Sequence, residues 1–487
     1  MQVRQLLDHL DHLSGFQFQG DSSSPFASLS IRLFKVRGSG HYAVLLDDSW
    51  SRATRDREPL NQLTLREKLA TALERGYTGF ICDSETASEP ALQGYDIISA
   101  DSSRELCFAL LQAVQGYRGE SMVAAITGSV GKSTTRGMLV HALRSVERPA
   151  SSVFAPSGLQ NTYSYTMNHL SKVPSYRYTA MEVSAGSLKT LRDRVSVSPD
   201  VAIVTGISEA HMDVMGSLRG VAERKALIFA APPPGGTAVI NRDTPESDYL
   251  INQAVRQGCQ LVTYGESPDA TIRLISYDDA SGHVVAKIGV RRVEYHLGAR
   301  GHHNAINSLA VLAALRSFRH PRWRDAMRSL RSFEALPGRG QRSALKLPSG
   351  GQATLIDDAY NANPASMRAS LRMLSSAQPG ESGRRIAVLG DMLELGPSTS
   401  ELHRALESAV LNSGADTVHL FGELMLGLRD QLRSHTDIHH WQDDSEALAL
   451  ALQEDVSPGD VLLVKASQGT GLHAVVDSLK AAYPPPA

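Results

Sequence analysis

The segment ITGSVGKSTT at residues 126–135 constrains the fold of this chain more than any other stretch. It follows the apolar run MVAA at 122–125 and contains Gly-Lys-Ser. Such a turn between a strand and a helix wraps backbone N–H groups around a phosphate, with the Lys ammonium as counter-charge and the Ser hydroxyl on Mg²⁺. The full loop pattern has Gly where Ile126 stands, so the family must be one that accepts the shorter form.

Buried-strand runs alternate with helical stretches from residue 122 onward, at MVAAIT, YTAMEVS, DVAIVTGI and GTAVIN. This alternation predicts a mostly parallel sheet with helices on its faces and a nucleotide site at the carboxyl ends of its strands. Between residues 268 and 298 the pattern alternates residue by residue, with turn chemistry at DDASG. That part predicts antiparallel hairpins added to the central sheet.

The turn-rich stretch LPGRGQ at 336–341 precedes a second series of strand runs, ATLI, RIAVLG, DTVHLFG and GDVLLVKAS. Near the N-terminus, runs at 42–46 and 78–82 flank the helical pattern LREKLATALERG. We therefore predict an α/β protein with three domains. These are a small N-terminal α/β domain at 1–118, a central P-loop parallel-sheet domain at 119–335 and a C-terminal Rossmann-like domain at 336–487.

Composition excludes several classes of protein. The 487 residues carry 49 basic and 51 acidic side chains without a long basic run, which argues against a nucleic-acid partner. Three scattered cysteines are too few for a disulfide framework or a zinc site. No apolar run approaches the roughly 20 residues of a membrane span, and the first residues resemble no signal peptide. We expect a cytoplasmic monomer that acts on small molecules.

Several polar residues sit where phosphate chemistry needs them. Lys132 and Ser133 lie where a strand gives way to a helix, and Glu182 ends a strand where a Mg²⁺ ligand is useful. His211 follows the next strand run, and Lys225 lies in AERKALIF. Each of the last three residues has an ordinary alternative, as a surface carboxylate, a satisfied histidine or a solvated helix lysine.

Two polar stretches stand at strand ends in the last third of the chain. IDDAYNANPASM at 356–367 brings together two carboxylates, a Tyr and two Asn, which could hold a ribose or an amino-acid substrate. LGDMLELG at 389–396 takes the same place after the next strand. Either stretch could instead be a loop with charged caps, and periodicity does not decide between these interpretations.

The order of the motifs resembles the Mur ligase family from about residue 120 to 475. The matching stretches are ITGSVGKSTT, EVSAGSL, TGISEAHMDVMGS, AERKALIF, INRDTP, GHHNAINSLA, PGRGQR, DDAYNANPASM, LGDMLELG and LLVKAS. The family's loop reads Thr-Gly-x-x-Gly-Lys-Ser/Thr, without the earlier Gly. The resemblance implies an ATP-dependent amide ligase: ATP phosphorylates a carboxylate, an amine attacks the acyl phosphate, and ADP and phosphate leave.

The resemblance also implies roles for single residues. Lys132 would contact the phosphates, Ser133 and Glu182 would hold Mg²⁺, His211 would serve a second Mg²⁺, and Lys225 matches a lysine that is often carbamylated. The remaining implied ATP contacts are Thr127, Gly128, Gly131, Thr134, Asn304 for adenine, Arg339 for phosphate, and Asp358 for ribose or phosphate. The implied substrate contacts are Asn161, Tyr360, Asn361, Asn363 and Lys465.

Three departures from the family pattern fall mostly in its first half. GLQNTYSYTMNHL keeps Asn161 but has Tyr165 and Met167 at the family's Gly and Pro positions. KALIF lacks the acidic residue that follows the carbamylated lysine. In SIRLFKVRGSGHYAVLL, the strand that cradles a uridine nucleotide is retained, but the Ser-Arg motif before it has different spacing.

These departures lead to the function that we expect from the sequence. We predict a ligase that joins an amino acid or dipeptide amine to a carboxylate other than the standard UDP-muramoyl tripeptide, in specialised metabolism. The DDAYNANPASM and LGDMLELG pair resembles the family branch that adds D-alanyl-D-alanine to that tripeptide, and this cell-wall reaction is the main alternative. A P-loop ATPase or kinase, or a nucleotide-binding scaffold without catalysis, would leave the C-terminal motifs unexplained.

Overall fold

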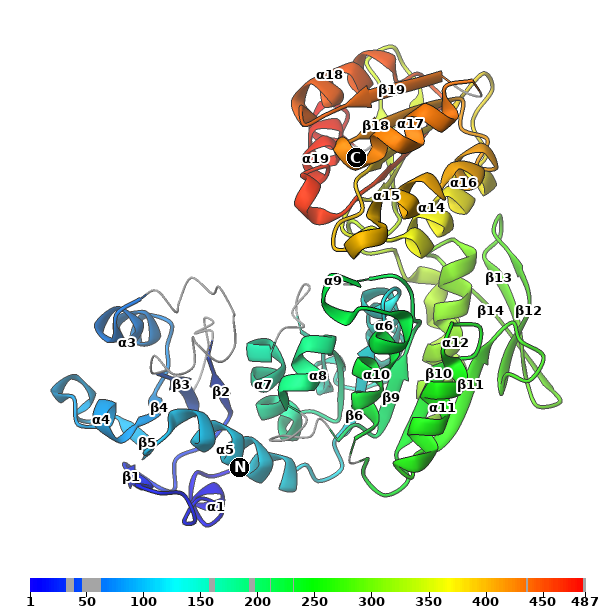
Figure 1. The fold of residues 1–487 in the computed structure, drawn as a ribbon. Helices are drawn as coiled ribbons and strands as arrows, with labels where there is room; N and C mark the ends of the chain where they lie inside the picture. Colours follow the sequence, from blue (N-terminus) through cyan, green and yellow to red (C-terminus); the bar gives the residue numbers. More distant parts are fainter. Residues whose placement is uncertain are drawn as a thin grey trace.

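The computed structural model shows three lobes, each built around one β-sheet (Figure 1). It describes residues 1–31, 39–45, 63–156, 163–191, 198–210, 212–230, 232–434 and 437–484. This arrangement confirms the predicted mixed α/β fold. Within these ranges, no helix has the length and apolar character needed to cross a bilayer.

The N-terminal lobe holds a five-stranded sheet in the order β1-β5-β4-β3-β2. Its strands are β1 (Gln17–Gln19), β2 (Ser28–Ser30), β3 (His41–Val44), β4 (Gly79–Asp83) and β5 (Asp96–Ala100). Only β1 runs antiparallel to its neighbour. The helices are α1 (Arg4–Leu7), α3 (Leu65–Glu74), α4 (Ser84–Ala87) and α5 (Ser103–Gly116). The predicted strand–helix–strand unit is confirmed as β3, α3 and β4, with a capping box from Thr64 to Glu67 starting the helix.

The central lobe holds a nine-stranded sheet in the order β14-β13-β12-β11-β10-β9-β6-β8-β7. Its strands are β6 (Met122–Thr127), β7 (Val153–Phe154), β8 (Tyr178–Glu182), β9 (Val201–Val204), β10 (Thr237–Asn241), β11 (Gln260–Gly265), β12 (Ile272–Asp278), β13 (His283–Ile288) and β14 (Arg291–His296). The strands from β7 to β12 are parallel, whereas β13 and β14 are antiparallel and extend one edge. The hairpins predicted between residues 268 and 298 are therefore confirmed.

Helices on both sides of this sheet complete the central lobe. They are α6 (Lys132–Val146), α7 (Tyr163–Lys172), α8 (Ala185–Leu191), α9 (Met212–Met215), α10 (Leu218–Ala226), α11 (Ser247–Arg256), α12 (His302–Ser317) and α13 (Trp323–Ser329). One buried hydrophobic cluster lines the face with α6, α12 and α13. The cluster on the other face continues without a break into the N-terminal lobe, from Ile240 to Leu6. The first two lobes thus share a core.

The C-terminal lobe holds a six-stranded sheet in the order β15-β16-β20-β17-β18-β19, parallel except for β15. Its strands are β15 (Gln341–Lys346), β16 (Gln352–Asp358), β17 (Arg385–Gly390), β18 (Thr417–Phe421), β19 (Asp437–Trp441) and β20 (Val461–Lys465). Its helices are α14 (Pro364–Ser376), α15 (Thr399–Arg404), α16 (Glu407–Leu411), α17 (Leu426–Leu432), α18 (Ser445–Asp455) and α19 (His473–Ala482). Its two hydrophobic clusters lie on opposite faces of the sheet and hold only residues of this lobe.

The strand order of the C-terminal lobe decides which of its loops meet. β20 lies between β16 and β17, so that Lys465 pairs in register with Asp358 on one side and Leu389 on the other. The two polar stretches predicted at successive strand ends therefore flank a third loop, which follows β20. The proposed domain boundaries at 118 and 335 stay predictions; the three sheets lie on either side of them.

Candidate active site between the central and C-terminal lobes

The predicted phosphate loop connects β6 to α6 through residues 128–131. Gly128 and Gly131 adopt positive φ angles of 149° and 80°. A Cβ atom on Gly128 would lie 2.0 Å from Thr205 Oγ1, and one on Gly131 would lie 2.5 Å from Asn307 Oδ1. Glycine is therefore required at both positions, and the loop leads directly into the N-terminus of α6, where free N–H groups favour an anion.

A charged cluster surrounds the start of α6. Lys132 Nζ donates a hydrogen bond to the Gly128 carbonyl oxygen at 2.8 Å, and Ser133 Oγ donates one to Glu182 Oε2 at 3.0 Å. Arg136 Nε lies 3.3 Å from Glu182 Oε1, and both side chains are buried. Burial lowers the pKa of Lys132 to about 8, an effect that Glu182 opposes and Arg339 reinforces. One carboxylate thus faces three cations, a balance that favours binding of an anion.

Lys225 is the least compensated cation of this region. Its side chain is buried on α10, and no hydrogen-bond or ion-pair partner is found for it within the described part of the chain. Burial lowers the pKa of Lys225 well below its usual value, and the nearby charge of Lys132 lowers it further. The default interpretation of Lys225 as a solvated lysine is therefore wrong. His211 and Asn161 lie outside the described residues.

The Ser133 hydroxyl and the Glu182 carboxylate form a pair of hard oxygen donors beside the phosphate loop. Mg²⁺ that bridges nucleotide phosphates takes one or two protein ligands of this kind and keeps several waters. The donors present therefore fit Mg²⁺. Among the residues that the structure describes, no group of three or more His, Cys, Asp or Glu side chains forms a metal cage.

The C-terminal lobe contributes a second charged cluster. Lys465 Nζ lies 2.9 Å from Asp358 Oδ2 and donates a hydrogen bond to the Asn361 carbonyl oxygen at 2.8 Å. Ser370 of α14 donates another to Asp358 Oδ2 at 2.5 Å. The Lys465 side chain is buried, so this pairing holds the DDAYN loop against β20.

Three further predicted residues, Arg339, Tyr360 and Asn363, lie in or near this loop. The Arg339 guanidinium lies over the Tyr360 ring at 4.5 Å, and Arg339 Nε is buried without a hydrogen-bond partner. The Asn363 side chain accepts a hydrogen bond from Ser366 N and caps α14. Arg339 is therefore available to an anion, whereas Asn363 already has a structural task.

A cavity of about 280 Å³ joins the two clusters. Seven predicted residues line it: Gly131, Thr134, Arg339, Asp358, Asn361, Asn363 and Lys465. The cavity is not lined by four other predicted residues near the phosphate loop: Lys132, Ser133, Glu182 and Lys225. Asn304 is buried next to it on α12, with Nδ2 bonded to Arg300 O and Oδ1 without a partner. Thr127 Oγ1 is likewise buried and unpartnered.

The wall of this cavity that α12 and the loops after β10 and β11 build was not predicted from the sequence. His302, His303 and Asn307 line the cavity, and only the first is exposed. Asn307 lies one helical turn after Asn304 in GHHNAINSLA, and this spacing of polar residues was the available signal. Burial lowers the pKa of His303 to about 4, so this imidazole is neutral near pH 7.

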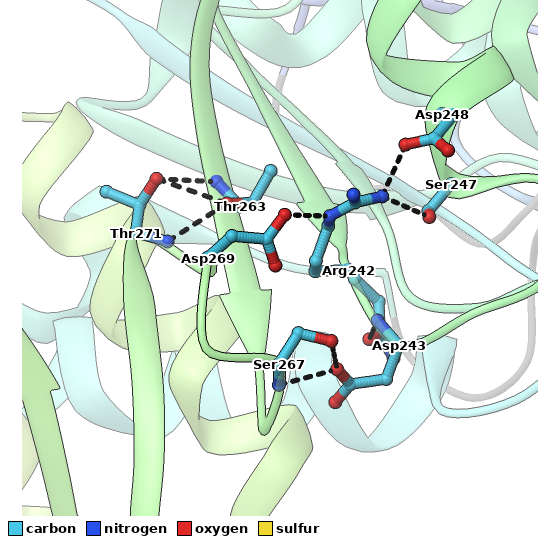
Figure 2. A network of polar contacts seen from close by, with 9 residues as sticks. Arg242, Asp243, Ser247, Asp248, Thr263, Ser267, Asp269 and Thr271 are labelled. Carbon is cyan, nitrogen blue, oxygen red and sulfur yellow. Dashed lines mark hydrogen bonds and ion pairs between the residues drawn. The ribbon is translucent and has the colours of Figure 1, made fainter.

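A polar network holds the loops after β10 and β11, which contribute Asp243 and Glu266 to that wall (Figure 2). Asp243, just after β10, accepts hydrogen bonds from Glu266 N at 2.6 Å and from the N and Oγ of Ser267 at 2.9 and 2.5 Å. The clamped loop presents Glu266, whose Oε1 lies 3.1 Å from His302 Nε2. Next to it, Arg242 binds Asp248 and Asp269. Asp243 therefore positions one side of the cavity.

The second polar stretch of the C-terminal lobe also reaches the central lobe. Met212 N donates a hydrogen bond to the Glu394 carbonyl oxygen at 3.0 Å, and Gly396 packs against the Asp213 backbone. LGDMLELG therefore contacts the start of α9. The structure thus brings the carboxyl edges of two sheets, from separate halves of the sequence, to one polar junction.

Comparison with known protein families agrees with this arrangement. Residues 126–315 match the model of the Mur ligase middle domain, and residues 339–468 match that of the Mur ligase glutamate ligase domain. The UDP-N-acetylmuramoyl-tripeptide–D-alanyl-D-alanine ligase of Bacillus subtilis is 29% identical over 418 residues, which are 84% of this chain and 86% of the relative. The enzyme of that name from Synechocystis is 30% identical over 373 residues, 74% and 75% of the two chains.

Solved structures share the fold across the whole chain. MurF from Acinetobacter baumannii superposes with a TM-score of 0.77 at 20% identity and covers 99% of this chain and 98% of its own. MurF from Thermotoga maritima in complex with ADP superposes with a TM-score of 0.71 at 22% identity and covers 93% of this chain and 97% of its own. The fold of the N-terminal lobe is therefore shared, despite the altered motif spacing there. The relatives do not support the expected use in specialised metabolism and favour the cell-wall alternative.

Proposed function

The chain belongs to the Mur ligase family of ATP-dependent carbon–nitrogen ligases, and from this premise we propose that it joins D-alanyl-D-alanine to a UDP-N-acetylmuramoyl tripeptide. The observation that carries the proposal is that relatives with this printed activity align over most of this chain and of themselves. The polar junction described above supports it, because two substrates and ATP must meet at one place.

In the proposed reaction, a carboxylate oxygen of the tripeptide attacks the γ-phosphorus of ATP, and ADP leaves. The amine of D-alanyl-D-alanine then attacks the acyl carbon, an amide bond forms, and phosphate leaves with the oxygen of the broken C–O bond. A carboxylate is a poor electrophile until it is phosphorylated. The main task of the protein is therefore to orient the phosphoryl group and to neutralise its charge.

Residues of both lobes fit that task. The N–H groups at the start of α6 and the Lys132 ammonium would hold the phosphates, and Arg339 would reach them from the C-terminal side. Asn304 Oδ1 is an unpartnered acceptor suited to the adenine amino group. Ser133 and Glu182 would hold Mg²⁺, which adds positive charge at the phosphates when bound.

On the amine side, the DDAYN loop fits recognition of a small zwitterion. Lys465 and Asp358 offer opposite charges at the carboxyl edge of the C-terminal sheet, and Tyr360 and Asn361 lie on the same loop. We propose that this pair orients the dipeptide or the ribose of ATP, with the capping residue Asn363 holding the loop in place.

The proposed acid substrate would reach the cavity along α7. This helix contacts the N-terminal lobe, where Ser171 Oγ bonds both to N and to O of Leu29 at 3.2 and 3.3 Å. Two buried atoms of α7, Asn168 Oδ1 and His169 Nδ1, have no hydrogen-bond partner in the described part of the chain. Unpaired buried groups at a junction of lobes favour a ligand there.

An assay of ADP release tests the proposal. The purified protein receives ATP and Mg²⁺ with the UDP-muramoyl tripeptide, with D-alanyl-D-alanine, or with both. We expect sustained ADP release only with both substrates, together with an amide product. ADP release that needs neither substrate would favour an ATPase. ADP release that occurs only when another carboxylic acid replaces the tripeptide would support the expectation of a different acid substrate.

A further inference from the structure

A groove lined by arginines lies at the edge of the central sheet, away from the candidate active site. Its volume is about 790 Å³, and it lies between the β13–β14 turn, the end of α12 and α13. The arginines that line it are Arg291, Arg292, Arg316, Arg324 and Arg328. All five are exposed. Apolar side chains line it as well, among them Val293, Met327 and Trp323.

The groove has more positive charge than its own carboxylates balance. Glu294 pairs with Arg292 at 2.8 Å and with His283 at 3.1 Å. Asp325 pairs with Arg328 at 3.1 Å and with Arg322 at 3.7 Å. Within the described residues, Arg291, Arg316 and Arg324 have no carboxylate partner. Three guanidinium groups therefore remain available to an external anion.

An aromatic side chain holds two of these groups in place. The Arg316 and Arg324 guanidinium carbons lie 5.3 and 4.4 Å from the centre of the Trp323 ring. A guanidinium stacked in this way loses less conformational freedom when it binds an anion. Beside them, Val290 forms the tip of the β13–β14 turn and is 94% exposed. Cations, an indole and an exposed aliphatic tip thus occupy one surface.

We propose that this surface, the arginine groove, binds the anionic headgroups of a lipid bilayer. The guanidinium groups match lipid phosphates, and Val290 and Trp323 suit the boundary between headgroups and acyl chains. The phosphate backbone of a nucleic acid offers no apolar layer for Val290, and the nearly balanced charge of the chain gives no extended basic track. The protein would be held at the membrane surface by this edge of the sheet.

Geometry keeps this contact apart from ligation. α12 begins at His302 beside the nucleotide cavity and ends at Ser317, next to Arg316 in the groove. At about 1.5 Å per residue, its two ends are about 20 Å apart. Bound lipid would therefore leave the cavity open, and substitutions in the groove should not change the rate of ADP release.

The test is sedimentation of the full-length protein with vesicles of phosphatidylcholine alone or mixed with phosphatidylglycerol. We expect binding only to the mixed vesicles and less of it at high salt. Arg291→Ser combined with Arg324→Ser should weaken binding roughly 20- to 30-fold, since each basic residue near the surface contributes roughly fivefold. Val290→Ser should weaken it up to about tenfold.

A matched control removes the same charge elsewhere. Arg4→Ser combined with Arg256→Ser lies outside the groove and should bind vesicles like the wild type. Equal binding to both kinds of vesicle, or equal losses in the two double variants, would overturn the proposal. So would binding of soluble poly-glutamate at the groove without vesicle binding, which would indicate an acidic protein partner. Absence of any binding would also overturn the proposal, and Arg291 and Arg292 would then act only as charges that prevent pairing of the edge strand β14.

Discussion

Single buried charges around the phosphate loop determine what this site can bind. Lys132, Arg136 and Arg339 share one nearby carboxylate, Glu182, and burial is the main reason that the pKa of Lys132 is lowered. Bringing cations together in a buried place is costly unless an anion joins them. Bound phosphate would reverse this balance and raise the pKa of Lys132 again.

Lys132→Ala should abolish ligation while the fold is retained. The ammonium contacts only the Gly128 carbonyl oxygen in the described structure and no hydrophobic cluster. We expect ADP release to fall by roughly 10²- to 10³-fold or more, as on loss of other charge-stabilising donors. Circular dichroism and the thermal unfolding midpoint serve as the control for folding. Activity near that of the wild type would refute the ATP assignment.

Lys225 should react with carbon dioxide to form a carbamate. Its lowered pKa increases the fraction of neutral amine near pH 7, and only the neutral amine is a nucleophile. We expect Lys225→Ala to lose activity and to regain part of it with added acetate, which replaces the carboxylate end of the carbamate. Lys225→Arg fills the space and should not respond to acetate. An unchanged rate in Lys225→Ala would exclude the role.

At the scale of elements, helix α7 carries a buried histidine, His169, whose protonation is unfavourable in the folded protein. Burial, and then the charges of Lys172 and Arg136, lower the pKa of His169 to about 3. The ring packs between Phe154 and Tyr165. The folded protein therefore keeps His169 neutral at pH values where the unfolded chain protonates it.

His169→Phe should make the protein less sensitive to acid. Below the unfolded value of 6.5, the unfolded state binds the proton that the folded state refuses, so the wild type loses stability as the pH falls toward 3. At about pH 5 this loss is about 2 kcal/mol. Urea unfolding at neutral pH and at about pH 5 measures it. The free energy of unfolding of the variant, relative to that of the wild type, should be larger at about pH 5 than at neutral pH. The same difference in free energy at both pH values would contradict this prediction.

The loop after β11 is a second element whose position depends on a neighbour. Asp243 accepts three hydrogen bonds from this loop, which carries Glu266 to His302 (Figure 2). We expect Asp243→Ala to raise the KM for ATP by roughly tenfold with a smaller change in kcat, since the lost contacts shape the cavity without touching the reacting atoms. Asp248→Ala removes an exposed carboxylate from the same network and should leave both constants unchanged. Equal effects of the two variants would refute the positioning role.

Elements were predictable where the chain is buried on both faces. The runs for β6, β8, β9, β10, β17, β18 and β20 were all recognised, because parallel strands under helices are nearly continuous in apolar residues. β19 was missed because it is an edge strand whose sequence, DIHHW, has no apolar run. The cavity wall was missed for another reason: Glu266 and His302 are 36 residues apart in the sequence and meet only through the fold.

At the scale of the whole molecule, the lobes are joined in two different ways. The N-terminal and central lobes share a hydrophobic cluster, whereas the described clusters of the C-terminal lobe stay within it. The junction with the C-terminal lobe is instead the polar cavity and the Met212–Glu394 contact. The order of motifs along the sequence predicted the ligase family and the fold. The acid substrate could not be predicted from the sequence, because altered residues in the N-terminal lobe do not exclude binding of a UDP-muramoyl peptide.

Oxygen transfer tests most directly whether this cavity carries out ligation through an acyl phosphate. The protein receives ATP, D-alanyl-D-alanine and a UDP-muramoyl tripeptide whose terminal carboxylate is labelled with ¹⁸O. We expect a pentapeptide product and inorganic phosphate that contains one ¹⁸O atom per turnover, because the oxygen of the broken C–O bond leaves with phosphate. Unlabelled phosphate, or ATP hydrolysis without the pentapeptide, would contradict it.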